Sequence, residues 1–219
     1  MGIALVLNII TLGCLADKAV ARSEDHLIPF DPIIDGPLRS IIESKLFQTP
    51  FECGRILDRP VETGERGISV YSSRAGGTII YLVTLTEAKR NMDIEYNINN
   101  GSLQAAKNVK VVRNDAQISA ATALMIRSAF KQMLKGAKQP AGYSRPGMHP
   151  QRMEFTIQNG QAKPGWAALP NESGPHVAAV LNLSKKLVEY CKTPSTERMS
   201  SEKEIERLAK HLVGKAEAR

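Results

Sequence analysis

The spacing of apolar residues changes several times along the chain, and each spacing predicts one kind of element. Over 37–47 these residues recur every three or four positions, which predicts a helix that starts at a proline and ends before Pro50. Over 68–73 and 78–86 the pattern is typical of strands, and a tight turn at 75–77 joins them. The second of these strands is apolar on both faces, which predicts a strand buried on both sides of a sheet.

The next segment alternates between apolar and polar residues. Over 92–98 every second residue is apolar, which predicts a strand with one buried face. Asn100-Gly101 then matches the signature of a type I′ hairpin turn, and the apolar residues of 103–112 supply the returning strand. With the two preceding strands, these segments predict a four-stranded antiparallel meander.

Two further helices are predicted in the second half of the chain. The first is capped by Asn114 or Asp115, carries a long apolar stripe and stops at Gly136. The second covers 176–191 and opens on Gly174-Pro175. Each has one apolar face, so both are expected to pack against the sheet.

A long loop and a second hairpin are predicted between these helices. The loop covers 137–152 and contains three prolines. Residues 153–157 alternate as a strand, Asn159-Gly160 supplies the turn, and the chain returns toward Trp166. The sheet is therefore expected to consist of the meander and this second hairpin.

These elements predict an α+β fold in which an antiparallel meander sheet and a second hairpin are packed by three helices. One domain over 22–195 accounts for them, and 196–219 form a charged C-terminal tail. Within the tail, 201–216 are expected to form a helix that begins with a capping box at Ser201. Its narrow apolar stripe suits docking on the domain, pairing with another protein, or a free helix.

The first 21 residues resemble a cleavable signal peptide in composition. Ile3–Ala16 is an apolar run of 14 residues, which is shorter than the ~20 needed to span a bilayer. Ala19-Val20-Ala21 then provides a small-x-small cleavage site. We therefore expect export to the periplasm or the medium with 1–21 removed. In an alternative interpretation, Cys14 is the lipidated residue of a lipoprotein.

The cysteines bear on the same prediction. Cleavage after Ala21 leaves Cys53 and Cys191. Two cysteines in an exported chain usually pair, so a disulfide between them is predicted. Neither lies in a local catalytic signature, which disfavours a cysteine nucleophile.

Charge is distributed unevenly along a chain whose formal net charge is +7. Residues 117–152 contain no acidic side chain but several cations. Five of these cations form a candidate anion-binding site: Arg127, Lys131, Lys135, Arg145 and Arg152. The first three are four residues apart and share one helix face. Such a face can bind an anion, or it can be only a solvated surface.

Candidate catalytic chemistry is sparse. The sequence has no GxSxG, HExxH, CxxC or P-loop motif, and its four histidines do not lie at metal-ligand spacing. We therefore assign no catalytic residue, metal or cofactor. The alternative is a secreted hydrolase or transferase with its site around the 137–152 loop, where His149 would act with a carboxylate brought in by the fold.

The leading hypothesis is an exported, non-catalytic binding protein with a basic face. Its partner is expected to be a membrane head group, an acidic polysaccharide or an acidic protein surface. Aromatic residues make up only 5% of the chain, which disfavours single-stranded nucleic acid as the ligand. Cytosolic nucleic-acid binding is the alternative if there is no signal peptide, and the 201–216 helix is a candidate surface for a protein partner.

Overall fold

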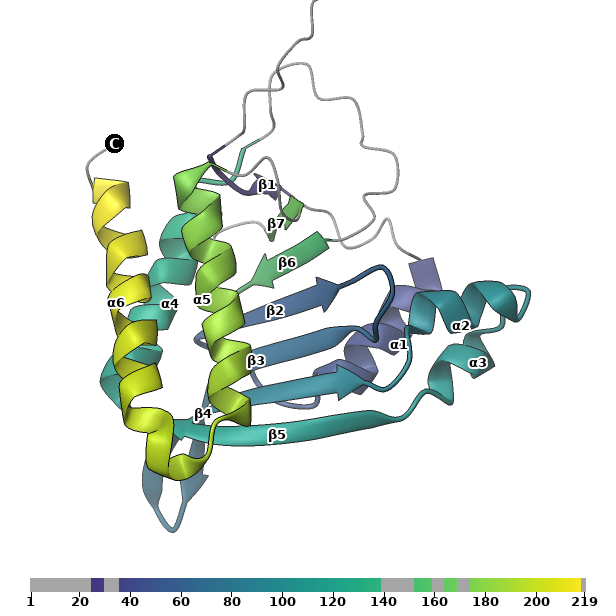
Figure 1. Ribbon diagram of the computed structural model, residues 1–219, viewed down its shortest axis with the longest axis horizontal. Coiled ribbons are helices and arrows are strands. Elements are labelled where there is room, and N and C mark those ends of the chain that lie inside the picture. The colour runs from purple at the N-terminus through teal and green to yellow at the C-terminus, as the bar shows by residue number, and fades with distance from the viewer. Residues whose placement is uncertain (1–24, 30–35, 139–151, 159–163, 169–173, 218–219) are drawn as a thin grey trace, which may run out of the picture.

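The computed structural model describes residues 25–29, 36–138, 152–158, 164–168 and 174–217. This part of the chain folds into one seven-stranded antiparallel sheet and six α-helices, so the predicted α+β class is confirmed (Figure 1). The strands are β1 (Ile28–Pro29), β2 (Gly54–Arg59), β3 (Arg66–Ala75), β4 (Thr78–Ala88), β5 (Val111–Ile118), β6 (Arg152–Thr156) and β7 (Gly165–Ala168). The helices are α1 (Gly36–Leu46), α2 (Met92–Ile98), α3 (Leu103–Lys107), α4 (Ala120–Lys135), α5 (Pro175–Lys192) and α6 (Arg198–Glu217), with a 3₁₀ turn, η2 (Ser195–Glu197), before α6.

The strand order is β1-β7-β6-β2-β3-β4-β5. The predicted second hairpin is present as β6 and β7, with Met153 opposite Ala167. A four-stranded meander is also present, and it runs from β2 to β5. Phe155 of β6 lies opposite Ile56 of β2, so the late hairpin extends the meander into a single sheet.

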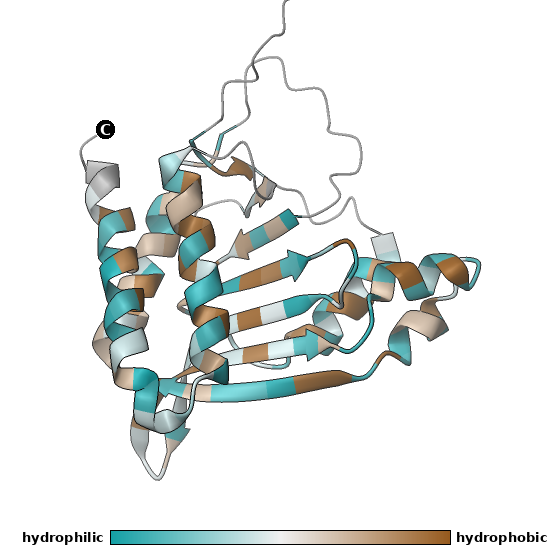
Figure 2. Cartoon of the chain, viewed as in Figure 1, coloured by the Kyte–Doolittle hydropathy of each residue, from teal (hydrophilic) through white to brown (hydrophobic). Residues whose placement is uncertain are grey.

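Alternate residues of the strands face two different helical layers. Ile56, Ile68 and Leu85 are neighbours across β2, β3 and β4, and they are buried in the core beneath α4, α5 and α6. Hydrophobic segments in the middle of these strands mark this core in Figure 2. On the opposite face a Cβ at Gly67 would lie 2.8 Å from the Cβ of Leu46, so α1 packs against the backbone there.

The segment 92–98 forms helix α2 and not the predicted strand. Alternation over seven residues is ambiguous, because apolar residues four apart also share a helix face. Met92 is fully buried, and Tyr96 packs against the same core cluster one turn later. Asn91 starts the helix, because its side-chain oxygen accepts a hydrogen bond from the Ile94 N–H at 2.9 Å.

The predicted return strand over 103–112 is also wrong in its first half, where Leu103–Lys107 form α3. Asn100 and Gly101 have positive φ angles of 54° and 77°, as a type I′ turn requires, but they join two helices. The fourth strand of the meander is β5. The first is β2. Its apolar residues are too few, and too closely flanked by arginines, to show the alternation that predicts a strand.

Helix α4 begins later than predicted. Asn114 and Asp115, the predicted caps, lie within β5. Ser119 caps the helix instead, because its Oγ accepts a hydrogen bond from the Thr122 N–H at 3.2 Å. The helix ends just before Gly136, as predicted.

The C-terminal helix α6 packs against α4 and α5. It begins at Arg198, three residues before the predicted capping box at Ser201. Its apolar stripe is buried in the main core: Ile205, Leu208, Ala209 and Leu212. A protein that bound α6 would therefore contact its charged outer side. No helix in the described part of the chain is long and apolar enough to cross a bilayer.

The predicted disulfide is wrong, because Cys53 and Cys191 are both buried and unpaired. The Cys53 N–H donates to the Val70 carbonyl on β3, whereas the Cys191 thiol donates to the Val83 carbonyl on β4. Adjacent strands are about 4.8 Å apart, so this places the two cysteines roughly two strand spacings from each other. Cysteines bridge only when their Cα atoms lie within about 7 Å.

The free thiols predict a pH dependence of stability. Burial raises the pKa of the Cys53 thiol to about 11 and that of Cys191 to about 12, from the ordinary value of 9.0. In the unfolded chain the thiols ionise first, so their contribution to stability is complete below about pH 9 and is lost as the pH rises through these raised values. Urea unfolding between neutral and alkaline pH should show this fall, and C53A/C191A should show a shallower one.

Thiol labelling checks the same correction. Both cysteines should resist a thiol reagent in the native protein and react fully once urea unfolds it without reductant. If the cysteines of the unfolded, unreduced protein failed to react, this would support the disulfide and contradict the free thiols.

Candidate functional site

The predicted basic face lies along α4. Arg127, Lys131 and Lys135 follow one another at four-residue spacing, away from the buried positions of the helix. Lys131 and Lys135 are exposed, whereas Arg127 is half-buried near Cys53, where its charge offsets part of the rise that burial causes in the pKa of that thiol. Lys138 continues the row just beyond the helix and is exposed. The row, named here the α4 face, therefore comprises four cations.

The cations of the α4 face have no carboxylate partner among the described residues, which sets them apart from most of the arginines that the structure describes. Arginines from α1, the sheet and the β4–α2 connection form ion pairs with Asp or Glu: Arg39, Arg55, Arg59, Arg66, Arg90, Arg113 and Arg152. The positive charge of the α4 face is therefore not balanced locally.

Arg152 does not join this face. It lies on β6, where residues alternate between the two layers, and its side chain shares the α1 side of the sheet with Glu154. The Arg152 Nε lies 2.7 Å from the Glu154 carboxylate. Arg145, the remaining predicted site residue, lies outside the described residues. His149 does so as well, together with most of the 137–152 loop.

Arginines also gather around Glu154, an arrangement that sequence analysis missed. Its carboxylate lies 2.8 Å from the Arg39 Nη2 and 4.0 Å from the Arg59 Nη1, in addition to Arg152. The Glu154 side chain is only 1% exposed. This Glu154 cluster joins α1, β2 and β6, so it is a buried ionic contact within the fold and not an open binding surface.

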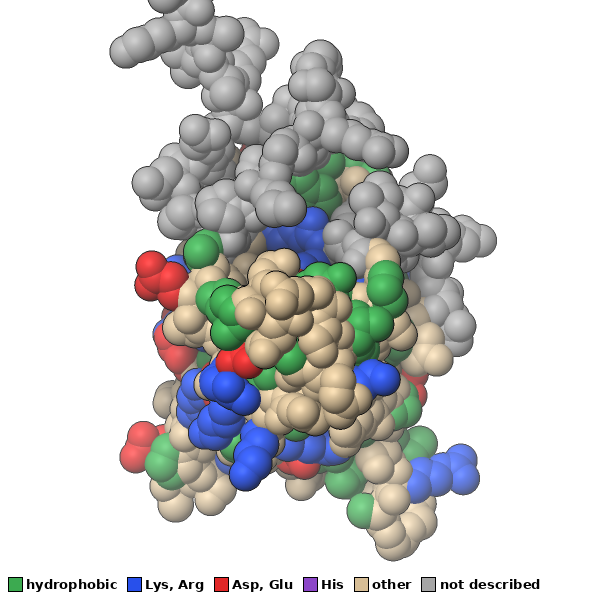
Figure 3. Space-filling view, turned by 90° about the vertical axis from the view of Figure 1, so that its right-hand side faces the viewer, with side chains coloured by type: hydrophobic (Ala, Val, Ile, Leu, Met, Phe, Trp, Pro, Cys, Tyr) green, Lys and Arg blue, Asp and Glu red, His purple; other side chains and the backbone are tan. Residues whose placement is uncertain are grey.

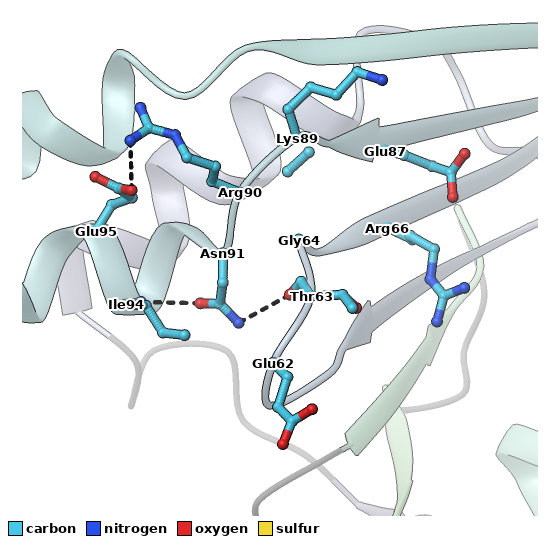
Figure 4. Close-up of a pocket in the computed structure, with 11 residues that line it drawn as sticks. Glu62, Thr63, Gly64, Arg66, Glu87, Lys89, Arg90, Asn91, Ile94 and Glu95 are labelled. Atoms are coloured by element: carbon cyan, nitrogen blue, oxygen red, sulfur yellow. Dashed lines mark hydrogen bonds and ion pairs between the residues drawn. The ribbon is translucent and has the colours of Figure 1, made fainter.

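A cavity of about 630 Å³ lies between the β2–β3 loop and the start of α2 (Figure 4). Asn91 shapes it, because its side-chain amide donates to the carbonyls of Pro60 and Thr63 at 2.9 and 3.0 Å. Glu65 lies beneath with a fully buried carboxylate, which accepts the Met92 N–H at 2.9 Å. Burial raises the pKa of this carboxyl group. Asn91 and Glu65 thus fix the loop to the helix.

The lining of this cavity carries charges of both signs, many of them already paired. Arg90 pairs with Glu95 at 2.7 Å, and Glu87 pairs with Lys192 at 2.9 Å at the rim. No histidine, cysteine or serine is among the described residues that line the cavity. Nor does the described part of the chain contain a group of three His, Cys, Asp or Glu that could hold a metal ion.

No protein-family model, no curated protein and no solved structure matches this chain. Its function is therefore inferred from its own surface. The α4 face could be found from sequence because four-residue spacing is local. The Glu154 cluster could not, because its members are brought together by strand pairing and by the packing of α1 on the sheet.

Proposed function

We propose that this is an exported, non-catalytic binding protein that holds an anionic partner on the α4 face. The observation that carries the proposal is the row of Arg127, Lys131, Lys135 and Lys138, none of which pairs with a carboxylate in the described chain. The three lysines are exposed and Arg127 is half-buried, and cations without partners attract anions over about a Debye length, ~8 Å at physiological salt. A partner that supplies the missing negative charge is therefore favoured.

The geometry of the row favours an extended polyanion. Residues four apart on a helix are about 6 Å apart along its axis. Three such cations follow a line on a convex helix surface, which suits repeated anionic groups better than one small anion enclosed in a pocket. Of a membrane head group, an acidic polysaccharide and an acidic protein surface, the polysaccharide fits this spacing best.

Retention on immobilised heparin tests the proposal. The variant R127Q/K131Q/K135Q is expected to elute at clearly lower salt than the wild-type protein, because it loses three unpaired charges. The matched control is K203Q/R207Q/K210Q on the solvent-facing side of α6, which also loses one arginine and two lysines. Equal shifts in the two variants would mean that only net charge governs retention and would contradict the proposal.

Export gives a separate prediction. Protein recovered from the envelope or the medium should begin at Arg22, because the expected cleavage follows Ala21. Intact-mass measurement checks this. A mass that retains Met1 would refute export by a cleaved signal peptide, and a lipid adduct on Cys14 would support the lipoprotein alternative.

A further inference from the structure

Helices α2 and α3 form a hairpin at the end of the molecule opposite to α4 (Figure 1). Ile94 and Ile98 of α2 are 43% and 67% exposed, although Met92 and Tyr96 of the same helix turn inward. Val61 on the neighbouring β2–β3 loop and Val112 at the start of β5 are 48% and 38% exposed. Apolar side chains are thus presented to solvent at this end of the molecule.

Lysines without carboxylate partners accompany these apolar side chains. Lys89, Lys107 and Lys110 are exposed, and none forms an ion pair within the described chain. Lys89 and Lys110 are neighbours, because the Lys89 N–H donates to the Lys110 carbonyl at 2.8 Å. Figure 3 faces this end and shows hydrophobic side chains with lysine and arginine side chains gathered beside them.

Most carboxylates at this end are already neutralised. Asp93 lies 2.7 Å from the Arg59 guanidinium, and Glu95 lies 2.7 Å from that of Arg90. The exceptions among the described residues here are Glu62 on the β2–β3 loop and Glu65, whose buried carboxylate accepts only backbone N–H groups. The free lysines therefore leave this end positive as well as partly apolar.

We propose that the α2–α3 end docks on an anionic lipid bilayer. Ile94 and Ile98 enter the head-group region, while Lys89, Lys107 and Lys110 lie against anionic head groups. Peripheral proteins bind membranes by combining a small apolar insertion with basic charge, since either contribution alone is weak. Because the α4 face lies at the opposite end, both surfaces can be occupied at once.

The composition of this surface favours a bilayer over a protein partner. Stable protein interfaces bury ~800 Å² on each side and are anchored by aromatic side chains or arginines in pockets. Here the exposed apolar side chains are few and aliphatic, and Tyr96 is partly buried against the core. A bilayer needs only a few apolar side chains near lysines.

Sedimentation with vesicles tests the proposal. The full chain should bind vesicles made of equal parts phosphatidylglycerol and phosphatidylcholine, and should not bind vesicles of phosphatidylcholine alone. K89Q/K107Q/K110Q should lower the partition coefficient about a hundredfold, because each lysine near an anionic surface contributes ~1 kcal/mol. I94S/I98S should lower it about tenfold through lost apolar insertion.

Matched controls separate docking from bulk charge and bulk hydrophobicity. K203Q/R207Q/K210Q removes three charges from α6, and I79S/M199S removes exposed apolar side chains far from α2; both should bind like the wild-type protein. All the changed residues are exposed, so circular dichroism should show folded protein throughout. Absence of binding to the mixed vesicles would overturn the proposal, and so would binding that tolerates I94S/I98S.

Discussion

Replacement of Glu154 by glutamine is expected to lower the free energy of unfolding by about 3–5 kcal/mol. The reason is that its carboxylate lies within 2.8 Å of Arg39 and Arg152 and is almost completely shielded from water. Removing the negative charge takes away the buried carboxylate that these arginines share with Arg59, so their positive charges repel one another with less compensation, although Glu43 still pairs with Arg39 and Asp93 with Arg59. Because glutamine has nearly the same shape, the loss should report charge and not packing.

The matched control for this substitution is Glu206→Gln, which breaks the exposed Lys210–Glu206 pair on α6. Exposed pairs contribute ~0–1 kcal/mol, so this variant should unfold nearly as the wild-type protein does. Urea denaturation monitored by circular dichroism measures both. Similar losses in the two variants would show that the Glu154 cluster contributes little to stability.

Elements whose signal is local could be predicted from the sequence. The helix α1, the β3–β4 hairpin with its Gly76-Gly77 turn and the late β6–β7 hairpin were all expected. Their apolar spacing is unambiguous, and glycine or proline marks their ends. The fold class followed from these elements.

The β4–β5 connection could not be predicted, because two periods describe it equally well. Met92, Ile94, Tyr96 and Ile98 fit a strand by their alternation, and only tertiary packing shows that Met92 and Tyr96 are the inner pair. Asn100-Gly101 adopts the expected left-handed conformation, but this conformation does not determine which elements it joins. The exposed Ile94 and Ile98 were consequently missed as a surface.

Contacts between residues far apart in the sequence could not be predicted either. The disulfide was inferred from the number of cysteines, whereas the register of β3 and β4 holds Cys53 and Cys191 apart. Arg152 was grouped with α4 by its position in an acid-free segment, but strand alternation turns it to the other face of the sheet. The shared face of Arg127, Lys131 and Lys135 could be predicted, because it depends only on helical geometry.

The second large effect expected is on polyanion affinity. R127Q/K131Q/K135Q should weaken heparin binding by about tenfold to a hundredfold at low salt, since each of the three charge contacts contributes ~0.5–1 kcal/mol. Stability should hardly change at Lys131 and Lys135, which are exposed, because exposed substitutions usually fall within about ±0.5 kcal/mol. The half-buried Arg127 is expected to account for most of any loss. Thermal unfolding of the variant checks that binding is lost from a folded protein.

The salt dependence of heparin affinity tests the role of the α4 face most directly. Each cation that contacts a polyanion releases counterions, so the logarithm of affinity falls with the logarithm of salt concentration in proportion to the number of contacts. Titration should give a clearly shallower slope for R127Q/K131Q/K135Q than for the wild-type protein, with K203Q/R207Q/K210Q retaining the wild-type slope. The same slope for all three proteins would contradict binding at the α4 face.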